Sequence, residues 1–283
     1  MSRPPDGEDS AVPGVFTVDV EDWYHPLRRD PATWHGLEDR IWVGTEILLA
    51  LLAATGNQAT FFVLGDVAER HPELVRTILA EGHEVGSHGH THQPLTSLTP
   101  GEFRDDLQRS LEALSAGGAQ TVRSFRAPYF SLEPGTHWAL EILADQGIQF
   151  DSSIFPLKTG YYGHTASPNR PYLLGSVVEV PIALPTVANI RLPLTGGFYS
   201  RFFPRSCIVA AVRRARARRD SPVYYIHPWE LDPGQPRIPA SRFLLFRHYL
   251  RLGTTEATVQ SVLGIGRWVG IERFLETYEG GLT

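Results

Sequence analysis

The chain has 283 residues, 42% of them hydrophobic and 20% charged, with a formal net charge of −5. This suits one large α/β domain, or two small ones, with ample core, and the acidic balance argues against nucleic-acid binding. The single cysteine, Cys207, excludes an intrachain disulfide and a cysteine zinc site. No run reaches the ~18 apolar residues of an integral membrane segment.

The first 13 residues are polar and proline-rich, and we expect them to form a disordered leader. They lack the apolar stretch of a secretory signal. We therefore expect a cytoplasmic protein, with peripheral association with the inner membrane as the alternative. Residues 14–235 are expected to form the main domain and residues 236–283 a helical C-terminal extension packed on it.

Short apolar runs rich in β-branched residues predict seven strands. They cover residues 15–20, 59–64, 83–87, 122–126, 148–151, 177–181 and 223–226. Helical spacing and end signals predict helices between most of them. These cover residues 45–54, 66–81, 99–114, 134–146 and 206–219. Residues 155–172 and 184–199 are predicted loops, and residues 241–282 alternate helical patches with glycine.

The alternation of strands and helices indicates a parallel barrel or an open doubly wound sheet. One regularity favours the barrel, because chemically active side chains lie at or just past the C-terminal ends of different strands. These residues are Asp19, His88, Arg126, Asp151 and His227. A barrel brings such strand ends together on one rim.

Four of the eleven histidines lie within residues 83–92. His88 and His92 are four residues apart, so one tight turn can direct both imidazoles at one point, as ligands of Zn²⁺, Co²⁺ or Ni²⁺. Catalytic zinc usually takes three protein ligands, and a carboxylate from elsewhere would suit as the third. The alternative is a surface histidine cluster without a role.

Three acids, Asp19, Glu21 and Asp22, lie at the end of the first predicted strand. Carboxylates at the end of a buried strand are costly unless they are paired or bind a metal. The alternative is that they cap the following helix.

Several ordered motifs resemble those of the polysaccharide deacetylase family, carbohydrate esterase family 4, across roughly residues 15–230. The matching segments are Thr17–Asp22, Ser87–His92, Arg126–Tyr129, Phe150–Ser153 and Tyr225–His227. The resemblance implies a distorted (β/α)7 barrel that removes N-acetyl groups from a glycan with a divalent metal, Zn²⁺ first and Co²⁺ or Ni²⁺ as alternatives. The segments 19–25 and 227–233 are similar to the subgroup associated with bacterial exopolysaccharide export loci.

The first motif departs from the family pattern, in which two adjacent aspartates follow strand one as base and ligand. Here Val20, Glu21 and Asp22 follow Asp19. Strand alternation puts Asp19 and Glu21 on one face. We therefore predict Asp19 as the catalytic base and Glu21 as the metal ligand, with Asp22 as the alternative ligand or a substrate contact.

The remaining roles follow from the chemistry of amide hydrolysis. Arg126 is expected to pair with Asp19 and orient it, although an ordinary salt bridge would be the same contact. His227 is placed to protonate the departing amine, and Asp151 could orient His227. The family implies a backbone N–H near Tyr129 that binds the oxyanion.

Substrate contacts are expected from Pro128, Tyr129 and Trp229, with core packing an equal alternative for the two aromatic residues. The basic run from Arg213 to Arg219 could touch an anionic glycan or a membrane, but a solvated helix face is preferred. The leading hypothesis is a deacetylase acting on an exopolysaccharide or its precursor. The alternatives are a hydrolase or deformylase acting on a small cytosolic amide, and a non-catalytic glycan-binding protein.

Overall fold

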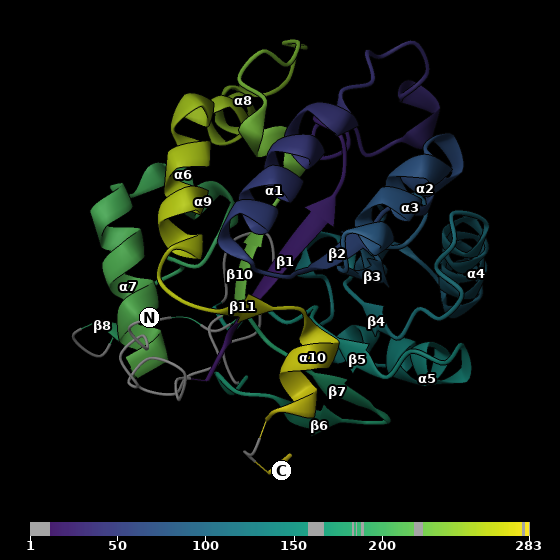
Figure 1. Ribbon diagram of the computed structural model, residues 1–283. Helices are drawn as coiled ribbons and strands as arrows, with labels where there is room; N and C mark the ends of the chain where they lie inside the picture. The colour runs from purple at the N-terminus through teal and green to yellow at the C-terminus, as the bar shows by residue number, and fades with distance from the viewer. Residues whose placement is uncertain are drawn as a thin grey trace.

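The computed structural model in Figure 1 describes residues 12–157, 167–182, 184, 186–187, 190–217, 223–278 and 281–282. Most of the expected leader, much of the predicted loop 155–172, and part of the predicted loop 184–199 lie outside these residues, as do Arg218 and Arg219. Within the described ranges, no helix combines the length and apolarity that crossing a bilayer requires.

All seven predicted strands are present, and neighbours pair in parallel in the order β10-β1-β2-β3-β4-β5-β7. Their bounds are β1 (Gly14–Val20), β2 (Thr60–Val63), β3 (Glu84–Ser87), β4 (Ser124–Phe125), β5 (Phe150–Asp151), β7 (Val177–Glu179) and β10 (Val223–Ile226). The sheet curls on itself (Figure 1), which confirms the expected distorted (β/α)7 architecture.

Within the part of the chain that the structure describes, four further strands were not predicted. Strand β6 (Tyr172–Leu174) pairs antiparallel with β7 at one edge of the sheet. Strands β8 (Thr186–Val187) and β9 (Ile190–Arg191) form a separate antiparallel pair. Strand β11 (Trp268–Val269) pairs with the first residues of β1. Three of these four strands are only two residues long, which is too short for alternation to be read from a sequence.

The helices follow the predicted β/α alternation. They are α1 (Ile41–Thr55), α2 (Gly65–Arg70), α3 (Pro72–Ala80), α4 (Pro100–Ala116), α5 (Trp138–Asp145), α6 (Gly197–Phe202), α7 (Arg205–Ala217), α8 (Arg242–Tyr249), α9 (Thr255–Leu263) and α10 (Ile271–Glu276). The single helix expected over residues 66–81 is split, because Pro72 restricts the backbone of His71, which is non-helical. Thr99 and Glu102 form the predicted capping box of α4.

Strand β1 is buried along its whole length, with two different environments on its two faces. Phe16, Val18 and Val20 belong to the apolar cluster that also includes residues of the surrounding helices. Val15 belongs to a separate cluster with Phe62 and Tyr225. Asp19 shares the face of Val15, because side chains alternate along a strand. Along this face of β1, the barrel interior therefore changes from apolar packing near the N-terminal end of the strand to a charged group near its C-terminal end.

The segment expected to be a helical extension, residues 236–283, contains α8, α9 and α10 and also contributes β11 to the sheet. The Ile271 N–H donates to Thr60 Oγ1 at 2.8 Å, which ties the start of α10 to β2. The C-terminal segment is thus built into the barrel wall.

Close packing of α1 against the turn after β10 predicts a sensitive position at Gly44. A Cβ atom added there would lie 1.8 Å from the carbonyl oxygen of Pro228. We expect Gly44→Ala to lower the free energy of unfolding by about 1–3 kcal/mol or more, because the backbone must shift. Gly101→Ala, in α4 with no heavy atom within 4 Å of the added Cβ, is the control and should lose no stability. Equal unfolding midpoints in denaturant would contradict this packing.

Candidate active site

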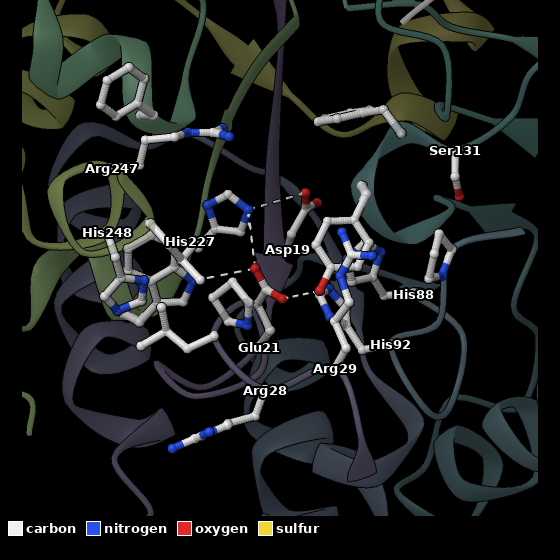
Figure 2. Close-up of a pocket in the computed structure, with 18 of the residues that line it drawn as sticks. Asp19, Glu21, Arg28, Arg29, His88, His92, Ser131, His227, Arg247 and His248 are labelled. Atoms are coloured by element: carbon white, nitrogen blue, oxygen red, sulfur yellow. Dashed lines mark hydrogen bonds and ion pairs between the residues drawn. The ribbon is translucent and has the colours of Figure 1, made fainter. Parts of the chain in front are cut away.

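The ends of β1 and β3 bring three potential metal ligands together. Atoms of Glu21, His88 and His92 lie within 4.8 Å of one another, and all three residues are buried. The His92 Nε2 atom is 2.6 Å from Glu21 Oε2. Figure 2 shows Glu21 between His92 on one side and His227 on the other. Strand alternation beyond Asp19 is what turns Glu21, the next odd residue, into this space.

The chemistry of these three residues fits a divalent cation. The Nδ1–H of His88 is positioned to donate to the carbonyl oxygen of Arg126 at 2.8 Å, which leaves Nε2 for a metal. Burial lowers the pKa of His88 to about 4, so the neutral form that binds a metal is favoured. His92 Nδ1 is buried without a hydrogen-bond partner among the described residues, and the contact of Glu21 Oε2 with His92 Nε2 at 2.6 Å is an ion pair that a shared cation could replace. Two histidines and one carboxylate match a common catalytic zinc set.

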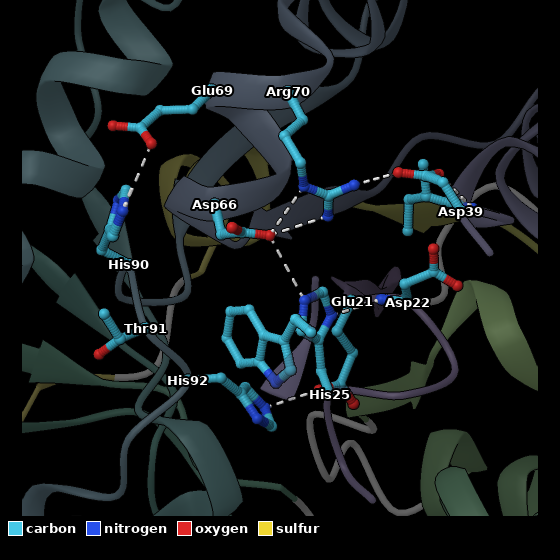
Figure 3. A network of polar contacts seen from close by, with 12 residues as sticks. Glu21, Asp22, His25, Asp39, Asp66, Glu69, Arg70, His90, Thr91 and His92 are labelled. Atoms are coloured by element: carbon cyan, nitrogen blue, oxygen red, sulfur yellow. Dashed lines mark hydrogen bonds and ion pairs between the residues drawn. The ribbon is translucent and has the colours of Figure 1, made fainter. Parts of the chain in front are cut away.

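Asp22, the alternative ligand, faces away from this cluster. Its carboxylate accepts hydrogen bonds from the backbone N–H groups of Trp23, at 2.7 Å, and Arg40, at 2.8 Å. The Asp22 N–H in turn donates to His25 Nδ1. Figure 3 shows His25 between Asp22 and Asp66. Asp22 also does not line the cavity described below, so both of its suggested roles need correction: it anchors the loop leading to α1.

Arg126, at the end of β4, pairs with Asp19 inside the barrel. The Nη1–Oδ1 distance is 2.6 Å, and Arg126 is fully buried. Its other N–H groups donate to Thr17 Oγ1, Ser152 Oγ and the Ser152 carbonyl oxygen. The guanidinium is therefore fixed on several sides, and the free oxygen of Asp19, Oδ2, is held toward His227 at 3.8 Å from Nε2.

His227 follows β10 and directs Nε2 toward Asp19 and Glu21, whose Oε1 is 3.3 Å away. Its Nδ1 is 2.7 Å from Glu230 Oε1. Burial alone would lower the pKa of His227. The hydrogen bond to Glu230 and the carboxylates of Glu21, Glu230 and Asp19 outweigh burial and raise it to about 9. His227 is thus cationic at neutral pH, as a proton donor must be.

The carboxylate that orients His227 is Glu230, and the prediction that Asp151 does so is wrong. Asp151 accepts from Ser153 Oγ, and Ser153 Oγ accepts from the Ala127 N–H at 2.7 Å. Asp151 therefore supports the turn after Arg126. Burial raises the pKa of Asp151 and raises that of the neighbouring Glu179 well above its usual value, so these two carboxyl groups favour sharing a proton.

Glu230 was missed, although its signal was present in the sequence. It stands three residues after His227 and directly follows Pro228 and Trp229, the spacing of a capping box on a short 3-10 helix over Pro228–Leu231. Arg201, in α6, donates through Nε to Glu230 Oε2 at 2.7 Å, and both side chains are buried. Nothing in the sequence around Arg201 indicated this long-range contact.

These groups open into a cavity of about 700 Å³. Its lining includes Asp19, Glu21, Arg28, Arg29, His88, His92, Tyr129, Phe198, Arg201, His227, Trp229, Phe243, Leu244, Arg247 and His248. The C-terminal segment supplies the last four residues, a contribution that the sequence did not predict. Two of the four expected substrate contacts, Tyr129 and Trp229, line the cavity. The other two, Asp22 and Pro128, are absent from its described lining.

Trp229 lies between two imidazoles. Its ring stacks on His248 at a centroid distance of 4.2 Å and on His227 at 5.2 Å. Its Nε1–H donates to Glu21 Oε1 at 3.3 Å. Tyr129 has a positive φ of 58°, and its ring lies 4.7 Å from that of His92. Both aromatic residues therefore border the metal-ligand cluster directly.

Comparison with known families divides the chain into two parts. Residues 39–150 match the family model described as polysaccharide deacetylase, and residues 152–276 match a model described as a domain of unknown function, DUF3473. The second match contains His227, Glu230 and the segment around α8. It also crosses the expected domain boundary at residues 235 and 236, which stays a prediction.

Two curated relatives match shorter segments. A chitooligosaccharide deacetylase of Bradyrhizobium sp. (strain ANU 289) is 42% identical over 86 residues, 30% of this chain and 39% of that protein. A peptidoglycan-N-acetylglucosamine deacetylase of Bacillus cereus is 35% identical over 98 residues, 34% of this chain and 36% of that protein. The chain thus spans well under half the length of these relatives.

Two solved structures share the fold. One from Mycobacterium smegmatis, assigned to the polysaccharide deacetylases, has a TM-score of 0.64 at 23% identity, covering 98% of this chain and 92% of that one. A family 4 carbohydrate esterase from Streptomyces lividans in complex with acetate has a TM-score of 0.52 at 19% identity, covering 93% of both chains. The fold is of the polysaccharide deacetylase type. The family model and the relatives show that part of this chain, residues 39–150 in the family match, is similar to polysaccharide deacetylases.

The ligand cluster predicts the metal content of variants. Purified protein should carry about one divalent cation per chain, and His88→Ala, His92→Ala and Glu21→Ala should each lose most of it, because three ligands are needed to hold it. Asp22→Ala is the matched control and should keep its metal. Elemental analysis after dialysis measures this. Retention by the first three variants, or loss by Asp22→Ala, would contradict the assigned ligands.

Proposed function

We propose that this protein is a metal-dependent deacetylase that removes N-acetyl groups from sugars of an exopolysaccharide or its precursor. The observation that carries the proposal is the convergence, in one cavity, of a three-residue metal-ligand cluster with Asp19 and His227. A metal held by Glu21, His88 and His92, Zn²⁺ first and Co²⁺ or Ni²⁺ as alternatives, would polarise the acetyl carbonyl and acidify water.

The chain's own residues supply the proton transfers. Asp19 accepts the proton of the attacking water through Oδ2, the oxygen that Arg126 leaves free. Arg126 keeps this carboxylate in one orientation through its four hydrogen bonds. His227 donates the proton that converts the departing nitrogen into an amine, and Glu230 holds the imidazole and stabilises its charge. Base and acid face each other across the space beside the ligand cluster.

The glycan part of the proposal is supported by the cavity and by the relatives. Tyr129 is a partly exposed aromatic residue in the cavity wall, and such a ring suits the apolar face of a sugar. The curated relatives named above act, by their names, on chitooligosaccharides and peptidoglycan. Much of this cavity wall lies in residues 152–276, outside the segment that matches the deacetylase model. A substrate different from those of the relatives is consistent with this division.

Two other functions compete with this one. A hydrolase of a small amide would need only the innermost part of a cavity of about 700 Å³, which argues for a larger substrate. The second competitor is a non-catalytic glycan-binding role, and the fold has a precedent for the loss of catalysis, because one structural neighbour from Bacillus anthracis is described as a family pseudoenzyme. The retention of Asp19, His227 and the complete ligand cluster argues against that role here.

The test is acetate release from N-acetylated oligosaccharides and from small amides. The metal-loaded protein should release acetate from the oligosaccharides, and His227→Ala should lower turnover by roughly 10²–10⁴-fold, the range for loss of one general acid, while keeping its metal. Preference for small amides would support the first competitor, and no release from any substrate would support the second. Near-normal turnover of His227→Ala would contradict the acid role.

The contact with Glu230 predicts how activity depends on pH. A proton donor works only below its pKa, so activity should fall as pH rises through the pKa of His227, about 9. Glu230→Gln removes a charge that raises this pKa, so the alkaline limb of the kcat profile should move to lower pH. Asp151→Asn, the matched buried control, should leave the limb in place. Movement in Asp151→Asn and none in Glu230→Gln would reverse the two assignments.

A further inference from the structure

Helices α6 and α8 expose three phenylalanines side by side. Phe202 is 49% exposed, Phe243 54% and Phe246 48%. Helix α8 spans eight residues and includes two phenylalanines, two leucines and a tyrosine, yet within it only His248 is buried. Large aromatic side chains gathered on a surface usually mark a binding surface, since single exposed apolar residues need no explanation but a cluster does.

The three residues belong to one continuous surface. The ring of Phe198 lies 5.5 Å from that of Phe202 and 6.2 Å from that of Phe246. The Arg247 guanidinium lies 5.5 Å from the ring centre of Phe198 and 5.9 Å from that of Phe243. We call this set, Phe198, Phe202, Phe243, Phe246 and Arg247, the aromatic surface.

The two chain segments that carry the aromatic surface contain charges of one sign only. Residues 197–207 and 241–253 contain five arginines and no aspartate or glutamate, although the whole chain has a net charge of −5. Arg205, Arg242 and Arg251 are exposed. Arg201 is buried against Glu230 and does not contribute to the surface. Exposed arginines flanking exposed phenylalanines are the composition of segments that lie in the headgroup region of an anionic bilayer.

The aromatic surface also adjoins the active-site cavity. Phe198, Phe243 and Arg247 line that cavity, whereas Phe202 and Phe246 are not among its described lining residues. Figure 1 shows α8 at the end of the molecule toward which β1 and β10 point, the end where the catalytic residues lie. Whatever the aromatic surface contacts is therefore held beside the entrance to the active site.

We propose that the aromatic surface docks this protein on the surface of an anionic lipid bilayer, with phenylalanines inserted among the headgroups and arginines on the lipid phosphates. The active-site entrance would then face the membrane, so a glycan attached to lipid could reach it; this second clause rests on the proposed function. A second copy of the chain is a poorer occupant, because a symmetric contact would bring the arginines of both copies together without an acidic partner.

The test is sedimentation of the full chain with vesicles. Phosphatidylcholine vesicles containing phosphatidylglycerol should bind the protein, and phosphatidylcholine alone should bind it much less, because the arginines need anionic lipid. Phe202→Ser/Phe246→Ser should weaken binding to the anionic vesicles by about tenfold or more, since two inserted rings are lost. Leu173→Ser, which removes a 57% exposed residue from β6, is the matched control and should bind normally.

Two results would overturn the proposal. One is equal binding of the double variant and the wild type to anionic vesicles. The other is a wild type that ignores vesicles but forms a dimer that the double variant does not, which would assign the aromatic surface to self-association. Acetate release from a soluble oligosaccharide is measured in parallel, and the double variant should retain it. Vesicle binding without acetate release by the wild type would reject the proposed function and leave the docking intact.

Discussion

The buried pair of Arg126 and Asp19 is the interaction on which the rest of the active site depends. Removing one member of such a pair leaves an isolated charge in the interior and typically costs about 3–5 kcal/mol. The guanidinium donates hydrogen bonds to Thr17 and Asp19 of β1 and to Ser152 just after β5, so it connects strands that are far apart in sequence. The backbone carbonyl of the same residue fixes the tautomer of His88. One residue thus orients both the base and a metal ligand.

Most of the fold could be predicted because its strands are short apolar runs that end in functional residues. Asp19, His88 and His227 mark strand ends in the sequence as clearly as turn residues do. What could not be predicted depends on distance along the chain rather than on local pattern. Strand β11 is two residues long and is defined by its pairing with β1, more than 250 residues earlier. Pro72 indicated a break between α2 and α3, because a proline disfavours a helical backbone in the residue before it. The helical spacing on both sides of Pro72 nevertheless led to the prediction of one helix.

Strand alternation correctly predicted which acidic residues at the end of β1 face the active site. The same alternation that buries Asp19 carries Glu21 inward and turns Asp22 outward, where backbone N–H groups hold it. Assigning Asp151 to His227 failed because strand ends were assumed to be equivalent around the rim. Asp151 lies across the barrel and is hydrogen-bonded to Ser153, whereas Glu230 is local to His227. His227 is therefore oriented by Glu230, three residues away, and not by Asp151 on another strand.

The C-terminal segment, residues 236–283, takes part in the contacts that determine the protonation state of His227. Burial opposes a cationic His227, and Glu230 can offset that only if it stays ionised. Burial would also raise the pKa of Glu230, but the charges of Arg201 and His227 outweigh it and lower that pKa. Arg201 in turn donates to the carbonyl oxygens of Arg247, His248 and Leu250 at the end of α8. Helix α8, which bears the exposed Phe243 and Phe246, is therefore connected through Arg201 to Glu230, the carboxylate that favours the cationic form of His227.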